Sequence, residues 1–377
     1  MNRFVFMINF RYSWYVKLED KLVNKNNLFN LAIALLLVML SAQVNANDMT
    51  NLYNGKIAVT DQSNLSRNNA IEILFERTLI KVSGQGKISQ HPNIEPQMSN
   101  ALSFATSFSF NNKDGQTYLN VEFNETLVDE LLRSNGVTLW GVRRPSAMLW
   151  LVYEDENGHR KLLNSQTNDE LSLAAKKAAD NRGLPLLLPI WDLDEQLILS
   201  IADVWGQFEN KVAMANTRYL SDYMILAKVT NHGISQKVHW NVYKISSGDF
   251  GQVVSENKMV GNDEAINIDD ALHQIVGQST DYFATQYGVD TSQDQGELFI
   301  TLVNIHSLGT YVDVVNYLKS IKAVDSLMLV NNKKHKYQFR VKLIGDKQSL
   351  VDVISLGNKM MEIENDDPNQ ILYQWGG

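Results

Sequence analysis

The chain contains no cysteine among its 377 residues. This absence excludes disulfides, cysteine nucleophiles, thiolate zinc sites, iron–sulfur clusters, c-type haem and a lipid-modified cysteine. The sequence also lacks a phosphate-binding loop, a GxSxG nucleophile motif and any pair of histidines at metal-ligand spacing. No motif therefore indicates a reaction, and we expect no cofactor and no bound metal.

An excess of positive charge is also missing, because the formal net charge is −8. Without the first 46 residues it becomes −11, since that segment holds five Lys and Arg but only two Asp and Glu. Binding to a phosphate backbone needs clustered Lys and Arg. Tyr337 and Phe339 alternate with polar residues, so they share one strand face with Val341. This predicts that the aromatic residues face the core and do not bind RNA. We therefore expect no nucleic-acid partner.

An apolar run covers residues 28–40 and is shorter than the ~20 residues of a membrane-spanning helix. Lysines precede it, and Val44-Asn45-Ala46 follows with a small residue at the last position. This order is typical of a signal peptide, and it predicts cleavage after Ala46 and a periplasmic product. The long segment before the run leaves two alternatives open. One is an uncleaved anchor in the inner membrane, which would be the chain's only membrane contact, and the other is a translation start downstream of Met1.

The length and an ordinary composition, 44% hydrophobic and 20% charged, predict a globular α+β protein of two or three domains. We expect a signal peptide at 1–46 and an N-terminal βαββα domain at 47–138. A middle α/β domain at 139–290 and a C-terminal domain at 291–377 follow. Polar residues 289–296 predict the linker between the last two.

In the N-terminal domain, apolar residues at helical spacing from Ile71 to Val82 predict a helix that ends at Gly84. Alternating apolar and small polar residues over 102–110 predict a half-buried strand. Asn111–Gly115 then reads as a five-residue hairpin loop. The sheet is expected to be antiparallel and covered on one face.

The middle domain is expected to hold strands, helices and an antiparallel meander. Its predicted strands are 147–153, 186–191, 222–230, 236–245 and 251–260, and its predicted helices are 171–182, two short ones within 194–216, and a long one from Ile268. The C-terminal domain has the order βαββαβ, which is typical of a ferredoxin-like fold, followed by one or two edge strands. The similar order in the N-terminal domain allows an internal structural repeat.

Acidic residues cluster at Asp192, Asp194 and Glu195, directly after a predicted buried strand. Carboxylates at the carboxyl end of a strand can hold Mg²⁺ or Ca²⁺. The competing interpretation is that an aspartate caps the following helix and Glu195 lies in its first turn. Both interpretations stay open, and the second is the reason why we expect no metal.

Arg143 and Arg144 precede Pro145 and could bind an anionic glycan or a phosphate. The alternative is that they form ion pairs with a neighbouring domain or are solvated. Tryptophan side chains could form a flat surface that binds a sugar. The large area that each tryptophan buries favours core and interface positions instead.

Several phrases of the sequence together resemble a known family. They are Leu52–Gly84, Trp140–Tyr153, Arg182–Glu195, Asp203–Phe208 and Arg218–Val229. The set resembles family 2066 of the domains of unknown function, exported proteins of Gram-negative bacteria, over roughly residues 50–360. The resemblance implies an envelope protein and no established activity, and it supplies no catalytic residue.

These observations predict an exported, non-catalytic accessory or assembly protein of the cell envelope, with other envelope proteins as partners. One alternative is an envelope hydrolase or metal-dependent enzyme that uses Asp192 and Asp194. The other is a periplasmic glycan or small-ligand binder that uses Arg143, Arg144 and tryptophan side chains. A pocket with two perturbed carboxylates would favour the enzyme, whereas an exposed apolar patch or an unpaired edge strand would favour assembly.

Overall fold

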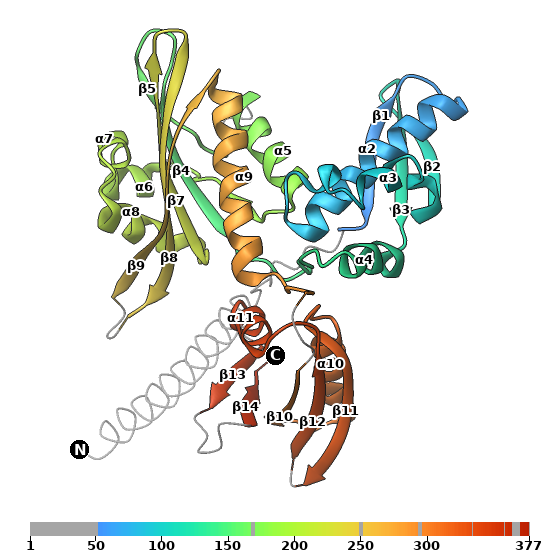
Figure 1. The fold of residues 1–377 in the computed structure, drawn as a ribbon. Coiled ribbons are helices and arrows are strands. Elements are labelled where there is room, and N and C mark those ends of the chain that lie inside the picture. Colours follow the sequence, from blue (N-terminus) through green and yellow to red (C-terminus); the bar gives the residue numbers. More distant parts are fainter. Residues whose placement is uncertain are drawn as a thin grey trace, which may run out of the picture. The chain divides into compact units, whose positions relative to one another are not determined.

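A computed structural model describes residues 52–166, 170–248, 252–292, 296–333, 335–357, 359–363 and 370–376. They belong to one unit, Asn47–Gly377, which holds three separate sheets and the helices that cover them (Figure 1). The predicted signal peptide and its cleavage site lie outside the described residues. Within the described residues, no helix is long and apolar enough to cross a membrane. The predicted α+β class is confirmed.

The N-terminal sheet has three antiparallel strands in the order β1-β3-β2. Its elements are β1 (Asn54–Val59), α2 (Asn64–Ser83), η1 (Ile88–Gln90), α3 (Glu95–Met98), η2 (Ala101–Phe104), β2 (Ala105–Lys113), β3 (Gln116–Phe123) and α4 (Glu125–Ser134). Apolar side chains of α2 and α4 pack with one face of the sheet to form its core. The opposite face of the sheet is polar.

Side chains and backbone conformation mark both ends of α2, and the predicted end at Gly84 is confirmed. The Ser63 hydroxyl accepts a hydrogen bond from the Ser66 backbone N–H at 3.2 Å, which is an N-cap. Gly84 ends the helix in the left-handed conformation, with φ of 72°. The predicted apolar face, including Ile71, Leu74 and Leu79, is buried.

The hairpin that follows differs from its prediction. The strand β2 begins at Ala105 rather than 102, because Ala101–Phe104 forms a 3₁₀ turn. It also continues to Lys113, so the connection is the two-residue turn Asp114-Gly115. Both turn residues have positive φ, 54° and 79°, as in the type I′ turn that Asp-Gly favours. The turn therefore lets the whole segment 111–113, expected as loop, pair with β3.

The middle sheet runs in the order β5-β4-β7-β8-β9, with β6 beside β4. The elements are β4 (Ala147–Glu154), β5 (Arg160–Leu162), α5 (Glu170–Arg182), β6 (Leu186–Leu187), α6 (Leu193–Ile198), α7 (Ile201–Trp205), α8 (Glu209–Asn216), η3 (Thr217–Tyr219), β7 (Tyr223–His232), β8 (Ser235–Ser247), β9 (Val253–Ala265) and α9 (Ile268–Tyr287). Helices α5 and α9 cover one face of the sheet and α6–α8 the other (Figure 1). The predicted meander β7-β8-β9 is confirmed, and β7 also pairs in parallel with β4.

Two predictions in this part are wrong. The strand expected over 186–191 is only Leu186–Leu187, because Pro189 cannot donate a ladder hydrogen bond and Trp191 has a φ of 60°. The stretch 194–216 holds three helices instead of two. The extra break falls at Ser200, whose capping box with Asp203 starts a new helix.

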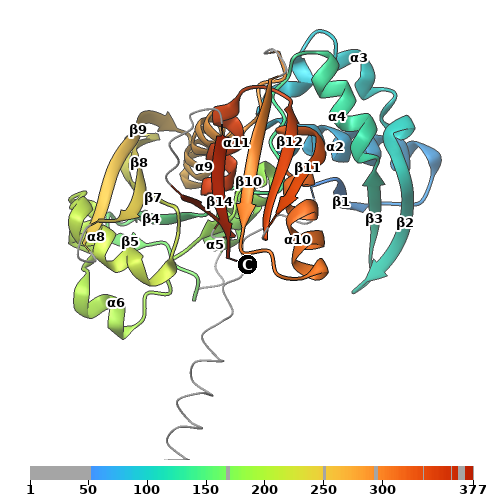
Figure 2. The ribbon, with the colours of Figure 1, turned by 90° about the horizontal axis from the view of Figure 1, so that it is seen from below.

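The C-terminal sheet has the order β11-β12-β10-β14-β13 (Figure 2). Its elements are β10 (Glu297–Val303), α10 (Leu308–Lys319), β11 (Val324–Lys333), β12 (Lys336–Leu343), α11 (Lys347–Ser355), β13 (Met360–Ile363) and β14 (Gln370–Trp375). Strands β10, β11 and β12 are placed as in a ferredoxin-like sheet. The position beside β10 differs from that sheet, because β14 lies there and is parallel to β10. Strand β13 pairs antiparallel with β14 and forms the edge. A terminal pair of strands thus replaces the single last strand of a ferredoxin-like sheet.

The C-terminal core draws only on residues from Val289 onward. Val289, the first residue of the predicted linker, is 1% exposed, and its backbone pairs with Leu139. The domain boundary therefore remains a prediction that a fragment can test. Expressed alone, 288–377 should unfold cooperatively, whereas 291–377 should unfold at a lower temperature because it loses a buried valine worth about 1.5–3 kcal/mol. Calorimetry of both fragments measures this, and a 288–377 fragment without a transition would place the boundary elsewhere.

Candidate functional site

Arg144 lies just before β4, and its guanidinium is buried, with 3% of the residue exposed. All five of its N–H groups are used. Nε donates to Gly141 O, Nη1 to Arg182 O and Gly183 O, and Nη2 to Lys81 O and Trp140 O, at 2.7–3.3 Å. Through these hydrogen bonds, this arginine holds the backbone of three segments together.

The charge of Arg144 is balanced by backbone rather than by a carboxylate. Its acceptors Lys81 and Arg182 lie in the last turns of α2 and α5, where unpaired carbonyls carry partial negative charge. Its guanidinium also stacks 3.9 Å from the centre of a Trp140 ring. Burial lowers the pKa of Arg144 to about 9, so the side chain stays charged at neutral pH.

Arg143 contacts the C-terminal part of the unit. Its guanidinium lies 3.8 Å from the centre of the Tyr317 ring, and Nη2 donates to Ser320 Oγ at 2.8 Å. Both arginines that the sequence singled out are thus bound to other segments of this chain. Their predicted role in binding an anion is not tested by these contacts and stays a prediction.

The acidic cluster is organised around the start of α6. Asp192 caps the helix by accepting from the Glu195 N–H at 3.1 Å, as the capping interpretation predicted, and it forms an ion pair with Arg218 at 2.7 Å. The hydrogen bond with Arg218 is the main reason why the pKa of Asp192 lies below its usual range. Glu195 is buried and accepts from the Trp191 N–H and the Tyr219 hydroxyl, whereas Asp194 is exposed. The described residues contain no group of three His, Asp or Glu placed to hold a metal ion.

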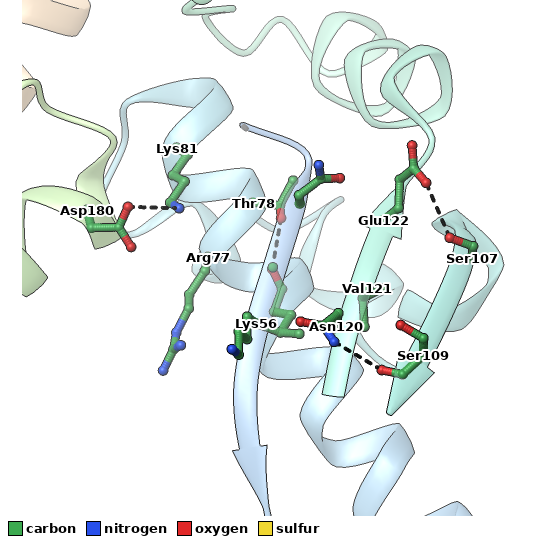
Figure 3. A pocket seen from close by; sticks show the side chains of 13 residues that line it. Lys56, Arg77, Thr78, Lys81, Ser107, Ser109, Asn120, Val121, Glu122 and Asp180 are labelled. Carbon is green, nitrogen blue, oxygen red and sulfur yellow. Dashed lines mark hydrogen bonds and ion pairs between the residues drawn. The ribbon is translucent and has the colours of Figure 1, made fainter. Parts of the chain in front are cut away.

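A hollow of about 680 Å³ lies at the β1 edge of the N-terminal sheet, where residues of the polar face and residues of α2 both line it (Figure 3). We call it the sheet groove. Its floor comes from β1, β3 and β2, and its wall from α2 and Asp180 of α5. The lining residues are Asn54, Gly55, Lys56, Leu74, Arg77, Thr78, Lys81, Ser107, Ser109, Asn120, Val121, Glu122 and Asp180.

Three cations line the sheet groove. Arg77 and Lys81 are four residues apart on α2 and share one helix face. The Lys81 ammonium lies 3.8 Å from an Asp180 oxygen. Burial lowers the pKa of Lys81; Asp180 opposes that shift, and the nearby cations Arg144 and Arg77 add to it. The lining of the groove carries these three cations, Lys56, Arg77 and Lys81, against two carboxylates, Glu122 and Asp180.

The floor of the groove carries amides and hydroxyls. Asn120 Nδ2 donates to Asn111 Oδ1 at 3.1 Å. Ser107 Oγ donates to Glu122 Oε2 at 3.2 Å (Figure 3). Sequence reasoning missed this site. Period-two alternation does place these polar residues on the outer face of their strands, but nothing in the sequence shows that α2 brings Arg77 to the same groove.

Large apolar side chains are exposed on several elements, and two places each hold a group of them. One is the helical layer, where they are Leu193, Leu197, Ile198, Phe208, Met214 and Leu220, at 50–82% exposure. The other is the edge strand β11, where the consecutive residues Met328, Leu329 and Val330 are 62%, 40% and 45% exposed. Exposed apolar surface of this kind marks contact sites for other molecules.

Comparison with known proteins corrects the family resemblance. A family described as a domain of unknown function (DUF8605) matches residues 46–141, so family 2066 is wrong. The match spans the N-terminal sheet and α2, and it leaves out the middle and C-terminal sheets. No curated protein matches the chain.

Among solved structures, the chain is similar to the LpoB C-terminal domain from Salmonella enterica. The identity is 15%, and the match covers 38% of this chain and 94% of that one, with a TM-score of 0.20. A likeness at that score supports no functional argument.

The role of Arg144 can be tested by Arg144→Lys. Lysine has three donors, so buried carbonyls at the ends of α2 and α5 lose partners, and we expect a loss of roughly 2–4 kcal/mol in the free energy of unfolding. Arg143→Lys, the neighbouring control, should cost about 1 kcal/mol because the cation stays near Tyr317. Urea unfolding measures both, and equal stabilities for the two variants would contradict the role of Arg144.

Acid stability should depend on Asp155 and Asp203, whose pKa values are both lowered to about 2, chiefly by hydrogen bonds from Lys161 and Lys211. A lowered native pKa means that these groups stabilise the fold above about pH 4 and lose that effect as pH falls toward 2. In Asp155→Asn, the urea midpoint should therefore fall less between pH 4 and pH 2 than in the parent chain. Asp114→Asn, in an exposed turn, serves as the control, and parallel losses in Asp155→Asn and the parent would refute the assignment.

Proposed function

We propose that this protein is a non-catalytic accessory or assembly protein of the cell envelope, exported to the periplasm, and that it works by binding another protein along the edge strand β11. The apolar run and Val44-Asn45-Ala46 of the sequence support export. The unpaired edge of β11 is the observation that carries the proposed mode of action.

Strand β11 pairs with β12 on one side only and is ten residues long. Backbone N–H and C=O groups on its other side are free to pair with an added strand. Between Ser326 and Val330 it has no charged residue and no proline, two of the devices that protect an edge, although register shifts occur at Asp325 and at Val330. Leu327 packs toward the core, so Met328 points to the opposite face by alternation, whereas Val330 lies at a register shift that interrupts the alternation. A partner segment would find backbone hydrogen bonds at the edge and an apolar contact beside it.

The geometry gives less support to an enzyme that uses Asp192 and Asp194. Asp192 is occupied by its helix cap and by Arg218, and its pKa is lowered by that arginine. A general acid or base near neutral pH needs a raised carboxyl pKa. The described carboxyl group with a raised pKa, Asp222, is half-buried and accepts from the N–H and the hydroxyl of Ser146, which ties β7 to the start of β4.

A pair of matched substitutions tests the proposal. Lysine on an edge strand opposes pairing with a neighbour, so Met328→Lys should weaken partner binding. Met361→Lys is the control, because Met361 is 52% exposed on β13, the opposite edge of the same sheet. A photo-crosslinking side chain at each position, in the full chain in Gram-negative cells, first identifies the partner.

The purified partner should then bind Met328→Lys about tenfold more weakly than the parent chain, a change of ~1.4 kcal/mol, and should bind Met361→Lys as tightly as the parent. Hydrogen exchange should slow at the amides of 326–332 in the complex. Equal crosslinking at the two positions, or a partner that binds Met328→Lys normally, would refute β11 as the binding edge.

A further inference from the structure

The sheet groove concentrates positive charge on an acidic protein. Arg77 is half-buried at its wall, and no carboxylate of the described residues forms an ion pair with it. Lys56 also lacks a carboxylate partner there, and its ammonium lies 4.4 Å from the centre of the Tyr118 ring. The charged ends of Arg77 and Lys56 point to the same side in Figure 3. Two cations without partners at one hollow provide a place for an anion.

The third cation is only partly neutralised. The Lys81 side chain is 13% exposed, whereas its partner Asp180 is 72% exposed. A carboxylate so open to water balances a buried ammonium poorly, because solvent screens the pair. A bound anion beside Arg77 would add the missing negative charge next to Lys81.

The floor of the groove suits a ligand with hydroxyl groups. Asn54, Asn120 and Ser109 offer amides and a hydroxyl that both donate and accept hydrogen bonds. The bond from Asn120 Nδ2 to Ser109 O is long, at 3.4 Å, so it can be exchanged for a ligand contact. A volume of about 680 Å³ lies within the usual range for small-ligand sites, ~300–1,000 Å³.

We propose that the sheet groove binds an acidic saccharide, with a sugar carboxylate on Arg77 and Lys56 and neighbouring hydroxyls on Asn54, Asn120 and Ser109. The planar guanidinium of Arg77 can hold a carboxylate through two parallel hydrogen bonds. The site is separate from β11 and from Arg143 and Arg144, the arginines that the sequence offered as candidates for binding an anionic glycan.

Other anions fit the lining less well. Glu122 and Asp180 also line the groove and would repel a chain with one charge on every unit, such as polyphosphate or a nucleic acid. The face of Tyr118 is covered by Lys56, so it is not open for a base to stack on. A saccharide with separated carboxylates can place its charge beside the cations and its hydroxyls beside the acids.

Calorimetric titration of the full chain with trigalacturonate at low salt tests the proposal. We expect saturable binding that weakens about tenfold in Arg77→Gln, because a charge-assisted contact is lost. Lys56→Gln should weaken binding in the same direction. Arg67→Gln is the matched control, since Arg67 lies on the same helix but over Phe108, outside the groove, and it should bind like the parent.

Thermal transitions of all variants show whether each one is folded. If Arg77→Gln does not fold, the comparison of Lys56→Gln with Arg67→Gln still tests the proposal. The proposal is overturned by the absence of binding at millimolar trigalacturonate, or by equal affinity in Arg77→Gln and Arg67→Gln. Equal binding of trigalactose would show that the carboxylates are not recognised. Equal binding of tripolyphosphate would show an anion site without sugar recognition, which also overturns it.

Discussion

The buried guanidinium of Arg144 is the interaction on which the joint between the N-terminal and middle sheets depends. Its five hydrogen bonds reach the ends of α2 and α5 and the Trp140–Gly141 segment. The ends of both helices bring negative partial charge toward one point, and a single cation satisfies both. Without it, the unpaired carbonyls of two helices would face each other in a dry interior, an arrangement that costs more than either helix end alone.

This joint restricts the residues around it. Gly183 has a φ of 65°, and a Cβ there would lie 2.5 Å from Arg144 Nη1, so both its conformation and the close approach require glycine. Gly84 is restricted in the same way, since a Cβ would come within 2.1 Å of the Ala284 Cβ. Both glycines end helices and thus have a second role, because they let α2, α5 and α9 approach the same place.

Sequence patterns predicted what is decided locally. The caps of α2, the meander β7-β8-β9 and the capping role of Asp192 follow from side chains and neighbours within one or two turns. The direction of a charged side chain does not follow in this way. The sequence around Arg144 does not show whether its side chain points to water or to backbone carbonyls. That depends on segments 63 and 39 residues away along the chain. For the same reason the sequence could not unite Arg77 with Asn120 in one groove, nor place β14 between β10 and β13.

The free edges of the three sheets show how unusual β11 is within this protein. Strand β5 has three residues and β13 has four, too short for extensive pairing with another chain. Strand β9 is long but carries Glu256 and Lys258, and β2 presents mainly serine, threonine and asparagine. At β11 the edge is long, and the stretch 326–330 is apolar and uncharged apart from its serine. Strand β1, the remaining edge of the N-terminal sheet, carries Lys56. The exposed apolar edge of β11 is therefore the edge that supports the proposed pairing with another protein.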